Sequence, residues 1–240
     1  MVTDSENRLH IMQKTAFLFP LAALVLLLCQ PAMAGGIAPG ATRLIYPESD
    51  SQASLAVTNS DSHERYLIQA WVENDKGQRD RDFFVTPPLF AAAPKSENTL
   101  RIVYTGKPLP RDREVVYWMN IKAIPAVDKA VVKGANTLQL AVLSRMKLFM
   151  RPDGLKMSES ESAEKLGVQQ EAGKLIVKNP TPYYQSLVNI SVGNRKLENT
   201  MVEPFGQREL KLPAGASGPV HYQTVNDYGA ITTQKTGKSS

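Results

Sequence analysis

The sequence has little of what enzymes and disulfide-stabilised proteins need. Its single cysteine, Cys29, lies in an N-terminal apolar segment, so the remaining chain must derive its stability from apolar cores without disulfides. Beyond that segment there are only two histidines, His63 and His221, and there is no HExxH motif and no glycine-rich phosphate loop before a helix. A Ser/His/Asp hydrolase stays formally open, although no serine lies in a strand-to-helix elbow. We expect no enzyme, no cofactor and no bound metal.

A concentration of positive charge is also missing. The formal net charge is +5, but the basic residues are scattered and no run of five or more occurs. Proteins that bind nucleic acid usually gather such residues on one face or helix. We therefore expect no nucleic-acid partner, and a mild preference for acidic partners at most.

No apolar run is long enough for a membrane anchor. The uncharged stretch 15–28 is shorter than the roughly 20 residues that a spanning helix needs. It follows Lys14 and precedes the small-residue sequence Pro31-Ala32-Met33-Ala34, the layout of a cleaved secretory signal peptide. The sequence predicts a signal peptide over residues 1–34, with translation starting at Met1 or Met12, and no stable membrane anchor.

Alternating apolar and polar residues dominate what remains, and no helical period competes with them. The pattern predicts an N-terminal domain over 35–155 and a second, smaller domain over 156–240, both all-β sandwiches. Proline and glycine at 151–154 and the acidic stretch 158–164 predict a linker with one helical turn at 162–165. The first domain is expected to hold seven strands, and the pattern delimits six of them, 54–59, 66–72, 82–86, 99–104, 115–124 and 137–150. In the second domain the expected strands are 174–178, 186–192, 209–212 and 220–225.

The expected strand 137–150 is unusually long. Leu138, Leu140 and Val142 share one face with Ser144 and Met146. A core strand with one face inward would show this pattern. So would an edge strand that offers its apolar residues to a partner, and the residues alone leave both interpretations open.

Two cations lie within apolar sequence. Lys147 precedes Leu148 and Phe149, and Arg43 follows Ala41 and Thr42 and precedes Leu44. Cations are rarely buried without partners, so each could extend its charged end to solvent, or the two could share one anion.

Segments in the same order along nearly the whole chain after residue 34 carry a resemblance to a known family. The chain resembles the periplasmic chaperones of the chaperone–usher pilus family, most closely the type 1 and P pilus branch with short loops. The matching segments are Gly40-Ala41-Thr42-Arg43-Leu44-Ile45-Tyr46-Pro47, Val85-Thr86-Pro87-Pro88-Leu89-Phe90, Leu109-Pro110-Arg111-Asp112-Arg113-Glu114, Trp118-Met119-Asn120-Ile121-Lys122-Ala123-Ile124-Pro125, Asn136-Thr137-Leu138-Gln139-Leu140, Lys147-Leu148-Phe149-Met150-Arg151-Pro152, Asn179-Pro180-Thr181-Pro182-Tyr183-Tyr184 and Asn226-Asp227-Tyr228-Gly229-Ala230.

The resemblance implies two immunoglobulin-like domains at an angle, with a cleft between them for pilus subunits. Arg43 and Lys147 match the basic pair that anchors the C-terminal carboxylate of a subunit. Leu138, Leu140 and Val142 match the strand donated to the unfinished sheet of that subunit, which is donor-strand complementation.

The resemblance also implies a charge network between the domains and a surface for the outer-membrane usher. Glu114, Arg151 and Asp227 match the network. Leu67 and the segment Thr86, Pro87 and Pro88 match the usher surface. The expected location is the periplasm, and the expected partners are pilus subunits and the usher. The alternative is a secreted adhesin or a structural immunoglobulin-like module.

Overall fold

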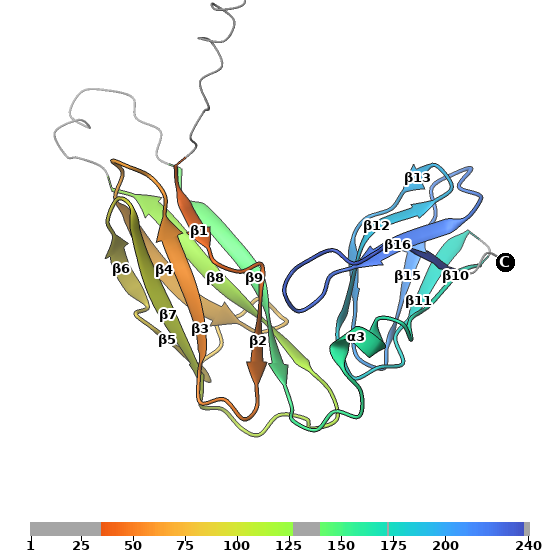
Figure 1. The fold of residues 1–240 in the computed structure, drawn as a ribbon, viewed down its shortest axis with the longest axis horizontal. Helices are drawn as coiled ribbons and strands as arrows, with labels where there is room; N and C mark the ends of the chain where they lie inside the picture. The colour runs from red at the N-terminus through yellow and green to blue at the C-terminus, as the bar shows by residue number, and fades with distance from the viewer. Residues whose placement is uncertain (1–34, 127–139, 172, 238–240) are drawn as a thin grey trace, which may run out of the picture. The chain divides into compact units, whose positions relative to one another are not determined.

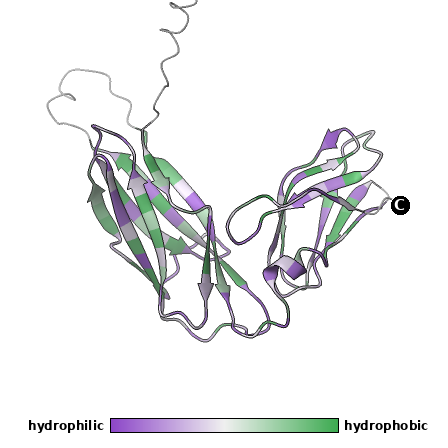
Figure 2. Ribbon diagram, viewed as in Figure 1, coloured by the Kyte–Doolittle hydropathy of each residue, from purple (hydrophilic) through white to green (hydrophobic). Residues whose placement is uncertain are grey.

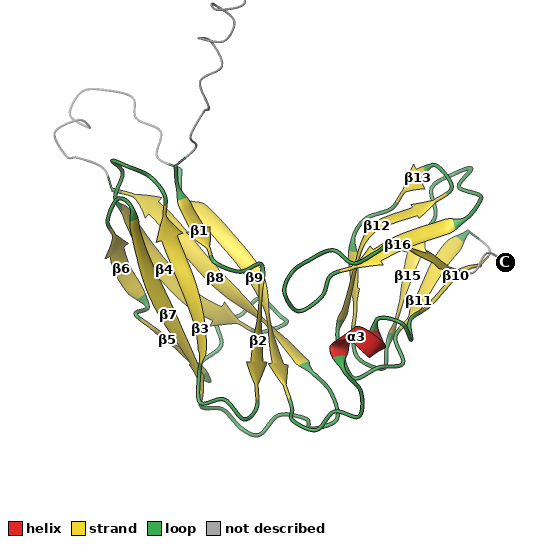
Figure 3. Ribbon diagram, viewed as in Figure 1, coloured by secondary structure: helices red, strands yellow, loops and turns green. Residues whose placement is uncertain are grey.

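The structure, a computed structural model, describes residues 35–126, 140–171 and 173–237, and the described residues from Gly36 onward belong to one compact unit. Its regular structure is almost entirely β-strand (Figures 1 and 3). The predicted signal peptide lies outside the described residues. Within the described ranges, no helix combines the length and the apolar character needed to cross a bilayer.

The first half of the unit is a β-sandwich of two sheets. One sheet has the strand order β1-β3-β7-β5 and the other has the order β2-β9-β8-β4-β6 (Figure 1). All described pairs in these sheets are antiparallel except β2 with β9, which is parallel. The strands are β1 (Ile37–Pro39), β2 (Arg43–Pro47), β3 (Ala53–Asn59), β4 (Tyr66–Glu73), β5 (Phe83–Thr86), β6 (Leu89–Ala92), β7 (Ser96–Tyr104), β8 (Val115–Pro125) and β9 (Val142–Arg151).

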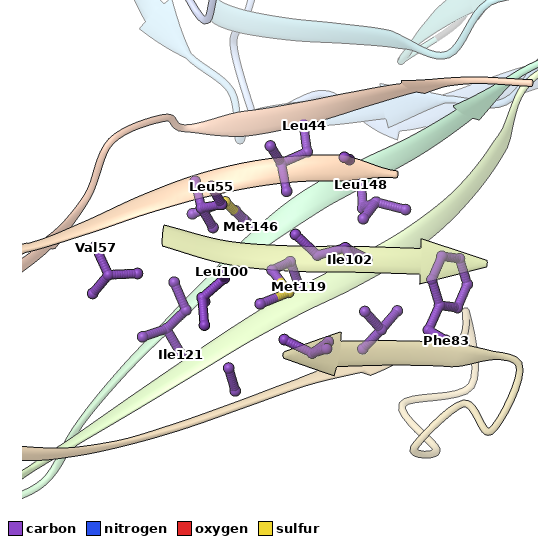
Figure 4. Packing of buried hydrophobic residues seen from close by; sticks show 14 of the residues in the cluster. Leu44, Leu55, Val57, Phe83, Leu100, Ile102, Met119, Ile121, Met146 and Leu148 are labelled. Carbon is purple, nitrogen blue, oxygen red and sulfur yellow. The ribbon is translucent and has the colours of Figure 1, made fainter. Parts of the chain in front are cut away.

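Alternation along the strands builds the core of this sandwich. Ile68, Ala70 and Val72 of β4 are all buried, while the residues between them are more exposed. Figure 2 shows the same alternation in colour along the strands. Figure 4 shows side chains from both sheets meeting in one cluster, including Leu55 and Leu100 from one sheet and Met119 from the other. Each buried side chain of this size contributes about 1.5–3 kcal/mol to stability.

The second half of the unit is a smaller sandwich with its own core. Its sheets have the orders β10-β11-β15 and β13-β12-β16-β17, and β14 also pairs with β12. Leu175, Leu187 and Ile190 are among the fully buried residues between them. The elements are α3 (Glu159–Ser162), β10 (Gly167–Glu171), β11 (Lys174–Lys178), β12 (Gln185–Val192), β13 (Arg195–Lys196), β14 (Thr200–Val202), β15 (Gln207–Lys211), β16 (Val220–Thr224) and β17 (Lys235–Gly237).

One buried asparagine in each sandwich makes the same set of hydrogen bonds. The Nδ2 of Asn59 donates to the carbonyls of Glu64, Ala92 and Ala93, and its Oδ1 accepts from the backbone N–H two residues later. The Nδ2 of Asn179 likewise donates to three carbonyls, those of residues 183, 202 and 203, and its Oδ1 accepts from the N–H two residues later. The two sandwiches therefore close one end of their sheets by the same device, although the sequence shows no obvious repeat.

The prediction of two all-β sandwich domains is confirmed, but several details were wrong. The described part of the first sandwich has nine strands rather than seven, and the three for which no range was predicted, β1, β2 and β6, have at most five residues each. The helix is Glu159–Ser162 rather than 162–165, because the Ser158 side chain and Glu161 form a capping box that starts it earlier. The acidic stretch is also packed in part, since Ser162 and Ala163 are buried.

The expected strand 137–150 was also wrong in its bounds. The observed strand β9 is Val142–Arg151, and residues 140 and 141 are described but lie outside it. Its pairing with β8 ends at Val142, opposite Ala123. Alternation predicts which residues suit a strand, but a strand forms only where the backbone has a neighbour to pair with. Leu138 lies outside the described residues.

Candidate functional site

The structure brings Arg43 and Lys147 together. They are register partners, Arg43 at the start of β2 and Lys147 on β9, and these two strands run parallel. Register partners on neighbouring strands project from the same face of a sheet. The two cations therefore lie side by side on one face, half-buried in both cases.

The pair has hydrogen-bond partners but no counter-ion among the residues that the structure describes. Arg43 donates from Nη1 to the carbonyl of Val225 at 2.9 Å, and Lys147 donates from Nζ to the hydroxyl of Ser186 at 2.8 Å. The Nε of Arg43 is buried and has no partner. Within the described ranges no carboxylate forms a salt bridge with either cation. Several N–H groups of the pair thus remain free for an added acceptor.

Burial and mutual repulsion make the pair electrostatically costly. Burial, followed by the positive charge of Arg43, lowers the pKa of Lys147 to about 8. Burial also lowers the pKa of Arg43, while the more distant carboxylates of Asp227, Glu159 and Glu114 act in the opposite direction. An anion bound between the two cations would offset both effects.

Packing from both sandwiches fixes the Arg43 side chain. Its guanidinium lies over the ring of Phe149, 5.7 Å from the centroid, and that ring in turn packs against Tyr184. Gly229 approaches Thr42 so closely that a β-carbon there would collide with the Thr42 hydroxyl, and its φ of +78° also favours glycine. The chain beside Arg43 is therefore held by a turn of the second sandwich.

The pair marks the point where an edge of β9 becomes free. β8 pairs with one side of β9 from Val142 to Met150, whereas β2 pairs with the other side only from Lys147 onward. In the described structure no strand pairs with that second side of residues 142–146. Leu140 and Val142 are 67% and 60% exposed. An unpaired edge with exposed apolar residues is a template for another strand.

The three residues of the expected charge network also meet. Arg151 donates from Nη1 and Nη2 to the two carboxylate oxygens of Asp227 at 2.6 and 2.7 Å, and from Nε to Glu114 at 2.8 Å. Glu114 accepts a further bond from the backbone N–H of Tyr184. Burial raises the pKa of Glu114 to about 7, although Arg151 opposes the shift. Burial alone would lower the pKa of Arg151, but the two carboxylates outweigh it and raise that pKa.

The residues expected to contact the usher lie near one another. Leu67 is on β4, which pairs with β6, and the carbonyl of Pro88 accepts from the N–H of Ala70 on β4. Thr86 ends β5 and is exposed, as are Leu67 and Pro88, whereas Pro87 is half-buried. The structure thus gives these residues neighbouring positions at one side of the first sandwich.

Two contacts of the cation pair were missed by the sequence analysis. Ser186 and the carbonyl of Val225 come from β12 and from the chain just after β16. Nothing in the sequence singles out a serine in a strand or a backbone carbonyl. Only the tertiary structure reveals them.

No feature of the described residues resembles a catalytic or metal site. Groups of three or more potential metal ligands do not occur in the ranges that the structure covers. His63 lies in an exposed bend and His221 lies within β16.

Two family models match the chain in succession. Residues 36–156 match the N-terminal domain of PapD, a pili and flagellar-assembly chaperone, and residues 161–236 match the C-terminal domain of the pili assembly chaperone PapD. The relatives are named as chaperones. The chain is 50% identical to the probable fimbrial chaperone SfmC of Escherichia coli strain K12, over 83% of this chain and 86% of that protein. It is 46% identical to the chaperone protein FimC of the same strain, over 97% and 98%.

Solved structures agree with the sequence relatives. The periplasmic chaperone SfaE has a TM-score of 0.74 at 46% identity, covering 84% of this chain and 99% of that one. The SafB chaperone, solved in complex with the SafA pilin of Salmonella enterica, has a TM-score of 0.75 at 32% identity, covering 85% and 97%. The prediction of a non-enzymatic binding protein is confirmed by these chaperone relatives, and the chain belongs to the PapD family of pilus-assembly chaperones of the chaperone–usher system.

Proposed function

We propose that the chain is a periplasmic chaperone that caps a pilus subunit by completing its unfinished sheet with β9. In this proposal Arg43 and Lys147 bind the C-terminal carboxylate of the subunit. The observation that carries it is the free edge of β9, which ends beside two adjacent cations that have unused donors and, among the described residues, no salt-bridge partner. The SafB relative, solved with a pilin, supports a pilin as the partner.

The geometry favours one direction for the bound strand. A strand added beside residues 142–146 would continue the line of β2, which begins at Arg43. If it runs parallel to β9, its C-terminus arrives at Arg43 and Lys147. An antiparallel strand would bring its N-terminus there, and a terminal ammonium group would be repelled. Charge-assisted hydrogen bonds to a carboxylate contribute about 1.5–3 kcal/mol each, so the pair selects both direction and register.

The donated side chains are Leu138, Leu140 and Val142. Burying each in an open groove of the subunit would contribute about 1.5–3 kcal/mol. The exposure of Leu140 and Val142 in the free chain supports this role, because both are available to a partner. No ATP is required, since the subunit can later exchange this strand for the donor segment of another subunit in a downhill step.

The proposal also covers export of the chain, the bounds of its domains and delivery of the bound subunit to the usher. Residues 1–34 serve as a cleaved signal peptide, the domains extend over 35–155 and 156–240, and the SfaE relative is named as periplasmic. Glu114, Arg151 and Asp227 fix the second sandwich to the end of β9. Leu67, Thr86, Pro87 and Pro88 meet the outer-membrane usher.

Co-expression with a pilus subunit tests the proposal. The chain and a type 1 pilus subunit are exported together, and the periplasmic extract is purified through a tag on the chaperone. We expect a one-to-one complex with the parental chain and loss of soluble subunit with Arg43→Ala or Lys147→Ala. Lys196→Ala, which removes an exposed cation of the second sandwich, is the matched control. Parental yields of soluble subunit with either anchor variant would show that the carboxylate anchor is wrong.

A further inference from the structure

We infer that Ser186, from the second sandwich, is a third donor to the subunit carboxylate bound by Arg43 and Lys147. This inference rests on the proposed function and adds to it a contact from the other sandwich. It identifies a binding residue that determines preference for a free carboxylate over other chain ends.

The position of Ser186 is unusual for a small polar residue. Leu187, its neighbour on β12, belongs to the core, so Ser186 lies on the opposite, outward face of that strand. It is nevertheless only 3% exposed. The Lys147 ammonium, with its Nζ 2.8 Å from the Ser186 hydroxyl, is the polar group in contact with it. The hydroxyl therefore lies at the cation pair and is shielded from bulk solvent.

In the part of the chain that the structure describes, the hydroxyl of Ser186 lacks an acceptor for its own hydrogen. Lys147 has donors only, so in this contact the Ser186 oxygen accepts and its own O–H is left over. Among the described residues, the only hydrogen bond of the Ser186 hydroxyl is the one from Lys147, so that O–H donates to no acceptor. The Nε of Arg43 is in the same condition, buried and without a partner. Leaving a buried donor unsatisfied costs about 1–3 kcal/mol, so both groups favour an added acceptor.

A carboxylate is the ligand that satisfies all of these groups at once. Its two oxygens offer about four lone-pair sites and no donor, which matches a guanidinium, an ammonium and a hydroxyl that all donate. A terminal carboxamide would instead turn an NH2 group toward one of these donors. The arrangement therefore discriminates between a free chain end and a neutral one of the same shape.

Peptide binding tests the role of Ser186. A synthetic peptide of the last strand of a type 1 pilus subunit is prepared with a free carboxylate and with a C-terminal carboxamide, and each is titrated calorimetrically. The parental chain should bind the free acid at least about tenfold more tightly than the amide, the effect of one hydrogen bond to a charged group. Ser186→Ala and Ser186→Val should lose about tenfold in affinity for the acid and less than about twofold for the amide. Ser186→Thr, which keeps the hydroxyl, should retain the preference.

The outcomes separate this inference from the function on which it rests. Equal losses of affinity for the acid and the amide with Ser186→Ala would overturn the inference, because Ser186 would then contribute only to packing. A parental chain that binds acid and amide equally well would overturn the carboxylate anchor itself. Melting temperatures of all four proteins verify that they are folded, and Ser186→Thr keeps the test decisive if the alanine variant folds poorly.

Discussion

Arg43 and Lys147 face each other across the one parallel strand pair of the described sheets, on adjacent strands and on the same face. The parallel pairing begins at these two residues, so the cations lie where β2 begins and the free edge of β9 ends. A strand that occupies the free edge in the direction of β9 must bring its C-terminus to them. One pairing register thus links a recognition site for a chain end to a site for strand addition.

The exposed residues before and at the start of β9 should matter for binding and not for folding. We expect Leu140→Glu and Val142→Glu to weaken subunit binding at least about tenfold, because a charge would replace an apolar side chain in the groove of the subunit. Thermal unfolding should change by less than a few degrees, since both side chains are exposed in the free chain. Met146→Glu, at a buried position of the same strand, is the contrasting variant and should lower the melting temperature strongly. A large loss of stability with Leu140→Glu would instead favour a core role for that residue.

Subunit binding should weaken in mild alkali. The pKa of Lys147 is lowered to about 8 in the free chain, and a bound carboxylate would raise it again. Binding is therefore fully supported below about pH 8 and declines as pH rises through the pKa of the bound state. Affinity for the free-acid peptide should fall by up to about tenfold from about pH 7 to about pH 9.

Lys147→Arg is the control for that titration, because a guanidinium stays charged over this range. Its affinity should show a much smaller pH dependence than that of the parental chain. Identical slopes for the two proteins would show that Lys147 is not the titrating group.

Removing Arg151 should destabilise the protein more than any exposed cation does. Arg151→Met would leave Glu114, which is 3% exposed, as a buried carboxylate without its ion-pair partner. We expect the free energy of unfolding to fall by about 3–5 kcal/mol in urea titrations. Arg111→Ala breaks an exposed pair with Glu48 and should cost under about 1 kcal/mol. Losses of similar size for the two variants would contradict a stabilising network.

Variants of the usher surface should impair docking of the loaded chaperone on the usher without impairing subunit binding. We expect Leu67→Glu combined with Pro88→Ala to leave subunit binding unchanged, since these residues lie on β4 and just before β6 rather than on β9. Surface pili, counted by electron microscopy, should be lost because the loaded chaperone no longer docks. Lys196→Glu serves as the control. Parental numbers of pili with the double variant would show that Leu67 and Pro88 are not part of the surface that docks on the usher.

The sequence was sufficient for the fold class, because alternation along strands such as β3 and β4 indicates directly which face is buried. It was also sufficient to single out Arg43 and Lys147, since cations within apolar sequence are rarely buried without a partner and the two could share one anion. Short strands were missed, because three residues such as those of β1 carry too little pattern.

Contacts set by tertiary structure could not be predicted. The start of β9 at Val142 depends on where β8 stops pairing, and the burial of Phe149 depends on Tyr184 from the other sandwich. Ser186 could not be predicted for the same reason, because its role depends on a hydrogen bond from Lys147, which lies in the other sandwich. The roles of the anchor, donor and usher residues remain predictions that rest on the placement described above.

Amide hydrogen exchange along β9 tests the central claim most directly. Backbone N–H groups of residues 142–146 that do not bond to β8 should exchange fast in the free chain and become protected when a pilus subunit binds. NMR spectra of the free chaperone and of its one-to-one complex measure both rates at each residue. We predict a slowing of at least about tenfold for these amides in the complex. A stable complex in which they exchange as fast as in the free chain would show that the subunit binds elsewhere.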